Sequence, residues 1–125
     1  MDKKFVMTAL GYAIVGLALG IFMAASKNKG QLVTHAHIML IGFVVSFIYA
    51  LCHKLWLHNV SSKLAAVQYY VHQVGTFFVV VGLFLYYGHF VSLETIDPVL
   101  ALASITVFVG MVLMKVLFIK SMKAV

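Results

Sequence analysis

The chain has 125 residues, of which 64% are hydrophobic and only 10% are charged, and its mean hydropathy is +1.09. Soluble domains are closer to half apolar, so this composition excludes an ordinary water-soluble enzyme. The formal charge of +6 comes from lysines at the ends of apolar runs, which indicates membrane topology and excludes a basic nucleic-acid-binding face.

Four apolar runs are long enough to cross a bilayer, and they cover residues 5–25, 32–57, 64–90 and 98–119. The first is too long for the apolar part of a signal peptide and is interpreted as a retained membrane helix. Pro98 suits the first turn of the last run. Backbone groups in lipid must bond within their own segment, so each run is expected to be a helix. The sequence predicts one all-α integral membrane domain over residues 1–125, a four-helix bundle.

The lysines also predict an orientation. The two outer-side loops hold only Lys27 and Lys29, beside Glu94 and Asp97, and the other lysines lie at the termini or near the second loop. The positive-inside rule then predicts that both termini lie in the cytoplasm. The membrane is expected to be the inner membrane of a bacterium. His35, His37 and His89 would lie toward the outer face, and His53, His58 and His72 toward the inner face.

Small residues recur at helical spacing. Gly16 and Gly20 form a small-xxx-small step on the first run, and Gly75 and Gly82 lie seven residues apart on the third. Such spacing favours close contact between membrane helices. Glycine is also simply common in membrane helices, so the spacing alone does not fix a contact.

The six histidines are the most informative residues, because an ionisable side chain inside a bilayer is by default a functional-site hypothesis. His35 and His53 lie eighteen residues apart, which returns to the same face of an α-helix. The polar and small residues predicted to share that face are Met39, Gly42, Ser46 and Tyr49. On the third run the predicted polar face holds Gln68, His72, Thr76, Tyr86 and His89, beside Gly75 and Gly82.

Two imidazoles at the same depth in the membrane, flanked by glycines that let a flat ring approach, are typical ligands of haem b. The candidate ligands are His35, His37 and His72, with Gly42 and Gly75 beside the ring and Tyr49, Thr76 and Gln68 as hydrogen-bonding neighbours. His53 and His89 are interpreted first as interfacial residues and second as metal ligands, and His58 is interpreted as a loop residue. His37 and His72 lie in opposite halves of the membrane, so they cannot share an iron within one chain. A homo-oligomer with a twofold axis along the membrane normal would place the same histidine of each copy at one depth.

Three alternatives stay open. Histidine with Met39 and Cys52 can bind copper, although these residues follow no repeated metal-spaced motif. Histidines can relay protons, but the predicted spans contain no acidic residue to accompany them. The chain can also be a non-catalytic assembly or accessory subunit that packs through its glycines.

Residues 34–56 read Thr34-His-Ala-His-Ile-Met-Leu-Ile-Gly-Phe and onward to Trp56, with an H-x-H-x-x-x-x-G-F pattern. This run resembles the second helix of subunit I in haem-copper oxidases, in the branch of cbb3-type oxidases and nitric oxide reductases. Tyr70-Val-His-Gln-Val-Gly75 resembles the helix that follows in short members of that group. The resemblance implies that His35 or His37 ligates a low-spin haem, for electron transfer with a quinol or respiratory redox partner or for sensing a diatomic gas.

The chain departs from that family in three ways. It has far fewer spans, and it lacks the adjacent His-His pair of the second metal, so a complete oxidase is not expected. It also has no arginine for the haem propionates, which leaves Lys27, Lys29 or backbone amides for that role. The choice between His35 and His37 stays open, because the predicted facing favours His35 and depth favours His37.

Overall fold

The computed structural model describes residues 1–123, and all regular structure in that range is helical. Four helical segments are long and apolar enough to cross a membrane. They are α1 (Asp2–Ser26), a second segment (Leu32–Leu55), α4 (Ser62–Tyr87) and α5 (Leu93–Lys123). The prediction of an all-helical chain with four potential spans is therefore confirmed.

Several boundaries differ from those expected, including both ends of the loop between α4 and α5. α4 ends at Tyr87, because the chain turns at Gly88 and His89 adopts a left-handed φ of 63°. α5 begins at Leu93 and contains Pro98, which was expected in its first turn. Ser92 precedes the helix, and its Oγ accepts a hydrogen bond from the Thr95 backbone N–H at 3.3 Å. Pro98 removes one helical hydrogen bond, and this part of α5 is exposed.

The second segment is not one uniform α-helix. It consists of α2 (Leu32–His37), a π-helix η1 (Ile38–Val45) and α3 (Ser46–Leu55). In a π-helix each N–H bonds to the carbonyl five residues earlier, which makes a wider turn than an α-helix and is often found at functional sites. The π-helix was not anticipated from the sequence.

The π-helix changes which residues of the second segment are buried. Thr34, Ile38, Gly42 and Ser46 are all buried, four residues apart. In a uniform α-helix, successive steps of four residues would drift around the axis by about 40° each. The wider turn of the π-helix offsets this rotation, so the four residues stay on one buried face. Thr34 occupies the buried position of this face, and His35 turns toward α1, against which His53 also packs through Phe5.

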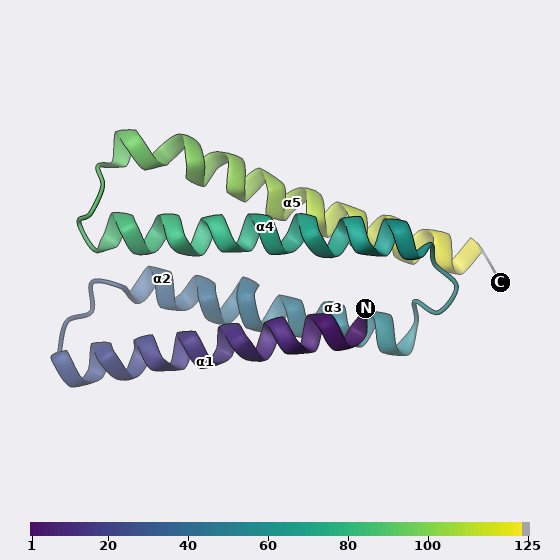
Figure 1. Ribbon diagram of the computed structural model, residues 1–125, viewed down its shortest axis with the longest axis horizontal. Coiled ribbons are helices and arrows are strands. Elements are labelled where there is room, and N and C mark those ends of the chain that lie inside the picture. The colour runs from purple at the N-terminus through teal and green to yellow at the C-terminus, as the bar shows by residue number, and fades with distance from the viewer. Residues whose placement is uncertain (124–125) are drawn as a thin grey trace.

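The four segments form two helical hairpins, α1 with the second segment and α4 with α5, and these hairpins lie side by side (Figure 1). The start of α1 and the end of α5 lie toward the same end of the molecule. On α4, a Cβ at Gly75 would lie 2.8 Å from the Val107 backbone nitrogen, and one at Gly82 would lie 2.7 Å from Leu100 Cδ2. These glycines bring α4 and α5 together, as the seven-residue spacing predicted.

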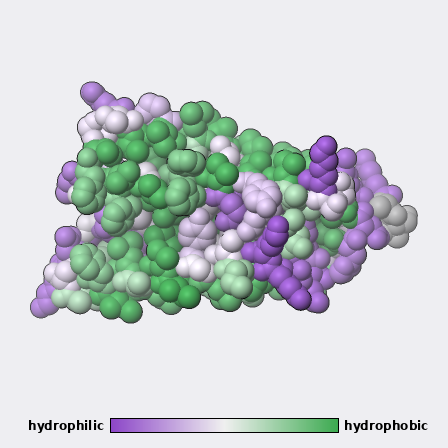
Figure 2. Space-filling view, in the orientation of Figure 1, coloured by the Kyte–Doolittle hydropathy of each residue, from purple (hydrophilic) through white to green (hydrophobic). Residues whose placement is uncertain are grey.

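Apolar side chains cover most of the outside of the bundle. Figure 2 shows hydrophobic surface over much of its length and hydrophilic surface gathered mainly toward the ends. Ile14 and Phe108 are examples, with exposed fractions of 69% and 68%. Soluble monomers rarely expose apolar surface on this scale. The outside of the bundle is consistent with a multi-pass membrane protein.

Candidate functional site

His72 lies at the centre of the bundle and is completely buried. Its Nε2 lies 3.0 Å from Ser46 Oγ, 3.2 Å from the Ile41 carbonyl oxygen and 3.4 Å from Thr76 Oγ1. Its Nδ1 is buried and has no partner within residues 1–123. We refer to His72, Ser46, Thr76 and the Ile41 carbonyl as the His72 cluster. The cluster joins α4 to the π-helix of the second segment.

The hydrogen bonds of the cluster assign the histidine tautomer. Ser46 Oγ donates to the Ile41 carbonyl at 3.2 Å, so its single proton is used. The proton between His72 and Ser46 then resides on His72 Nε2, which donates to Ser46 Oγ and to the Ile41 carbonyl. His72 Nδ1 is left as an unprotonated, unpartnered acceptor. Because the ring is enclosed by protein, neither nitrogen faces a space that holds a macrocycle.

The neighbours of His72 are aromatic rings and a second buried amide. The Tyr49 ring meets the His72 ring edge-on at a centroid distance of 5.0 Å, and Phe5 lies 6.2 Å away. Gln68, one turn earlier on α4, donates from Nε2 to the Gly110 carbonyl of α5 at 3.0 Å. Its Oε1 is buried without a partner in the described chain. The predicted neighbours Tyr49, Thr76 and Gln68 thus lie around His72 or beside it.

His35 is held differently, in the contact between α2 and α1. Its Nδ1 lies 2.8 Å from the Gly16 carbonyl oxygen, so Nδ1 carries the proton and donates it. A Cβ at Gly20 would lie only 3.1 Å from His35 Cε1, so the imidazole lies directly against the backbone of α1. The lack of a side chain at Gly20, within the Gly16–Gly20 step, therefore makes room for the His35 ring. His35 is partly exposed, and its Nε2 makes no hydrogen bond to residues 1–123.

His37 is also oriented by a carbonyl, but within its own helix. Its Nδ1 lies 2.8 Å from the Val33 carbonyl oxygen, four residues earlier. The ring is partly exposed and points away from His35, as the two-residue spacing on a helix requires. His35 and His37 therefore cannot bind one iron within a single chain.

The other three histidines are scattered. His53 is buried and stacks on Phe5 with a centroid distance of 5.7 Å, and its Nε2 lacks a partner in the described chain. His58 is exposed in the linker after the second segment. His89 lies in the exposed turn after α4, so its expected place on the buried face with His72 is wrong.

The glycines predicted to flank a flat cofactor are filled by protein. A Cβ at Gly42 would lie 2.6 Å from Tyr12 Cγ, so the Tyr12 ring of α1 occupies that space. Gly75 faces the backbone of α5. Within residues 1–123, no three histidine, cysteine or acidic side chains converge where they can hold a metal ion. The positions beside Gly42 and Gly75 are therefore occupied by protein and are not open to a flat ring.

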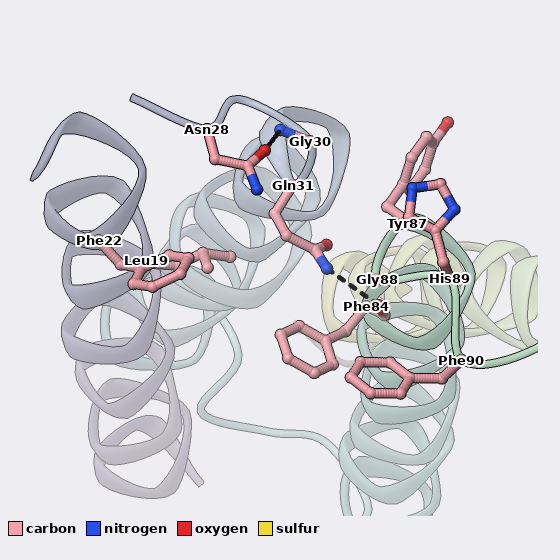
Figure 3. A pocket seen from close by; sticks show the side chains of 10 residues that line it. All are labelled: Leu19, Phe22, Asn28, Gly30, Gln31, Phe84, Tyr87, Gly88, His89 and Phe90. Atoms are coloured by element: carbon pink, nitrogen blue, oxygen red, sulfur yellow. Dashed lines mark hydrogen bonds between the residues drawn. The ribbon is translucent and has the colours of Figure 1, made fainter. Parts of the chain in front are cut away.

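A cavity of about 440 Å³ opens at the end of the bundle where α1 and α4 end. We call it the loop cavity. Figure 3 shows Gln31 reaching across it from the first loop to the Phe84 carbonyl, with Phe22 on one side and Phe84 and Phe90 on the other. The Gln31 Nε2 to Phe84 oxygen distance is 3.0 Å, and the Phe84 and Phe90 rings stack at 6.1 Å. His35 follows Gln31 by one helical turn, since its N–H donates to the Gln31 carbonyl.

Sequence reasoning missed the partners that define these sites. It proposed His72 as a ligand but did not identify the bond from His72 to the Ile41 carbonyl, because that bond depends on how α4 packs against the second segment. One signal was present: Thr34, Gly42 and Ser46, the small or polar residues of the buried face, fall at multiples of four. Residues spaced in this way drift around the axis of a straight α-helix, so the spacing is not that of a uniform α-helix.

Comparisons with known proteins add no relative to this description. No protein-family model matches the chain, and neither a curated protein nor a solved structure matches it. The resemblance of residues 34–56 to an oxidase helix therefore depends on the residue pattern alone.

Proposed function

We propose that this chain is a multi-pass protein of the bacterial inner membrane that binds haem b for electron transfer, with His35 as an axial ligand. One observation carries the proposal. His35 Nδ1 donates to the Gly16 carbonyl while Nε2 remains without a protein partner. Histidines that bind metals almost always donate their other ring nitrogen to a carbonyl or carboxylate in this way. The resemblance of residues 34–56 supports a ligand at His35 or His37.

The second axial ligand is proposed to come from a second copy of the chain. Twofold symmetry along the membrane normal places His35 of both copies at the same depth. This accounts for a His35 that is partly exposed in a single chain. His37 is the alternative ligand, because its Nδ1 is fixed in the same manner. His72 is not assigned as a ligand, because both its nitrogens are enclosed.

Bound between two imidazoles, haem iron exchanges single electrons, and its potential is set by burial and by hydrogen bonds to the ligands. The residues of this chain would contribute the orientation of His35, through Gly16, and the close approach of α2 to α1, through Gly20. An iron with an open position would instead bind a diatomic gas, which carbon monoxide tests directly.

A quinol is proposed as the electron donor, with its ring in the loop cavity. The volume of about 440 Å³ lies within the range of small-molecule sites. The lining is mainly apolar and aromatic, with amide side chains from Asn28 and Gln31. The cavity also lies one helical turn from His35, on the same segment.

The test is a reduced-minus-oxidised absorption spectrum of the purified protein, expressed with ample haem. The proposal expects sharp α and β bands, their loss in His35→Ala, and their retention in His58→Ala, a matched histidine in the exposed linker. If His35→Ala keeps the wild-type spectrum and His37→Ala loses it, the ligand assignment moves to His37. A wild-type protein without haem would refute the proposal.

The second candidate is a non-catalytic accessory subunit. The bonding of His72 favours it, because this deepest histidine is used to connect α4 with the π-helix. In that case the wild-type protein carries no haem, and His35→Ala leaves its association with other membrane proteins unchanged.

A further inference from the structure

We propose that His72 is a positioning residue: it holds the second segment in its π-helical register and thereby turns His35 toward α1. The inference rests on the proposed function only where haem is the readout. Its structural part concerns the chain alone.

The π-helix needs an external partner. η1 consists of the residues Ile38–Val45, with the sequence IMLIGFVV, and none of its side chains can form a strong hydrogen bond. π-helices are rare and usually short. The side chains of this eight-residue example offer few interactions that would stabilise the π-helical geometry. A backbone carbonyl left unbonded in the apolar interior costs free energy. The His72 cluster supplies bonds to the Ile41 carbonyl at the middle of this π-helix.

The bonds of the cluster are specific for the π register. Ser46 Oγ donates to the carbonyl five residues earlier, at Ile41, rather than to the carbonyl four residues earlier that an α-helix would present. His72 Nε2 lies within hydrogen-bonding distance of both Ser46 Oγ and the Ile41 oxygen, at 3.0 and 3.2 Å. One imidazole N–H therefore reaches the two groups that the wide turn brings together.

The register decides where His35 points. Thr34 and Ser46 are both completely buried, although they are twelve residues apart. In a uniform α-helix, positions twelve residues apart differ by about 120° around the axis. If the residues of η1 adopted α-helical geometry while α3 stayed in place, α2 would rotate about the helix axis by about this angle. His35 would then leave the Gly16 carbonyl.

The chain offers a matched control for this effect. Gln68 lies one turn from His72 on α4 and is equally buried. Its bond goes to Gly110 of α5 and does not involve the π-helix. A general loss of buried hydrogen bonding should therefore appear in Gln68→Ala, whereas a change of register should appear only in variants of the His72 cluster.

The experiment uses the full chain in lipid bilayers with ¹⁵N-labelled histidine, with the His35 signals assigned by their loss in His35→Ala. We expect His72→Ala to remove the signature of the hydrogen-bonded His35 Nδ1. His72→Gln should keep it, because the Gln amide nitrogen reaches the place of Nε2, whereas the shorter side chain of His72→Asn should not. Gln68→Ala should leave it as in the wild type. If His72→Ala does not fold, Ser46→Ala is expected to weaken the same signal.

Haem content gives a second readout. Removal of an outer partner of a metal ligand typically lowers affinity by about 10- to 100-fold, and His72→Ala is expected to lower haem retention by at least about tenfold. An unchanged His35 signal in both His72→Ala and Ser46→Ala would overturn the inference, as would an equal change in Gln68→Ala. A protein without haem would refute the proposed function but would leave the ¹⁵N result as a valid test of the register.

Discussion

Gly75→Ala tests the packing of α4 on α5 at a position where the two backbones lie in close contact. The new Cβ would lie 2.8 Å from the Val107 backbone nitrogen and 3.1 Å from the Ala103 carbonyl oxygen. Both neighbours are backbone atoms, which cannot move aside as a flexible side chain can. The two helices must separate by about 0.6 Å to restore an ordinary contact of 3.4 Å.

Gly11→Ala is the matched control, because a Cβ at Gly11 meets nothing within 4 Å. Both variants gain the preference of alanine over glycine in a helix, about 0.8–1.0 kcal/mol. The difference between them therefore isolates the overpacking at Gly75, for which we expect about 1–3 kcal/mol. Gly11→Ala should be at least as stable as the wild type, and Gly75→Ala should be clearly less stable than Gly11→Ala.

The measurement is the free energy of unfolding in mixed micelles, titrated with a denaturing detergent and followed by circular dichroism. The reasoning would be refuted if the two variants unfolded at the same detergent fraction. That result would mean that the α4 and α5 backbones are not in contact at Gly75.

Three further predictions follow from individual contacts. Phe5→Ala should lower the free energy of unfolding by about 3–5 kcal/mol, because Phe5 is completely buried. Phe22 is 57% exposed, so Phe22→Ala should lower it much less in the same titration. Equal losses would contradict the assignment of the core. Gly20→Ala should displace the His35 ring by a few tenths of an ångström and lower haem content, measured as haem per protein, and wild-type haem content would show that the ring does not lie against α1. Phe84→Ala should weaken the binding of a quinone analogue, because it removes an aromatic ring that lines the loop cavity. The affinity is measured by calorimetry, and an unchanged affinity would mean that the quinone binds elsewhere.

Apolar run length was sufficient to predict four helices, because a bilayer fixes the length of a span and polar loops mark its ends. The contact of α4 with α5 was predictable too, since Gly75 and Gly82 are seven residues apart and return to one face. The helix ends were less predictable. Pro98 suggested a helix start, but Ser92 provides a cap six residues earlier in the exposed loop.

The candidate site was harder to predict, because its geometry depends on contacts between segments. The prediction assumed uniform α geometry for the second segment and did not include the π-helix, which brings Thr34 and Ser46 to one buried face. The π-helix depends on a bond from His72, twenty-six residues after Ser46, and no local pattern encodes that bond. Likewise, the Gly16–Gly20 step indicated a close contact but not that the His35 ring would lie against Gly20.

The central claim is that His35 Nε2 binds the iron of a haem while Nδ1 is held by Gly16. The most direct measurement is the haem-to-protein ratio of purified wild-type protein and of His35→Ala, with electron paramagnetic resonance of the oxidised wild type. The account predicts a low-spin ferric signal typical of two imidazole ligands and a loss of haem in His35→Ala. A wild-type protein that stays free of haem in haem-rich cells, or a His35→Ala protein with the same signal, would contradict it.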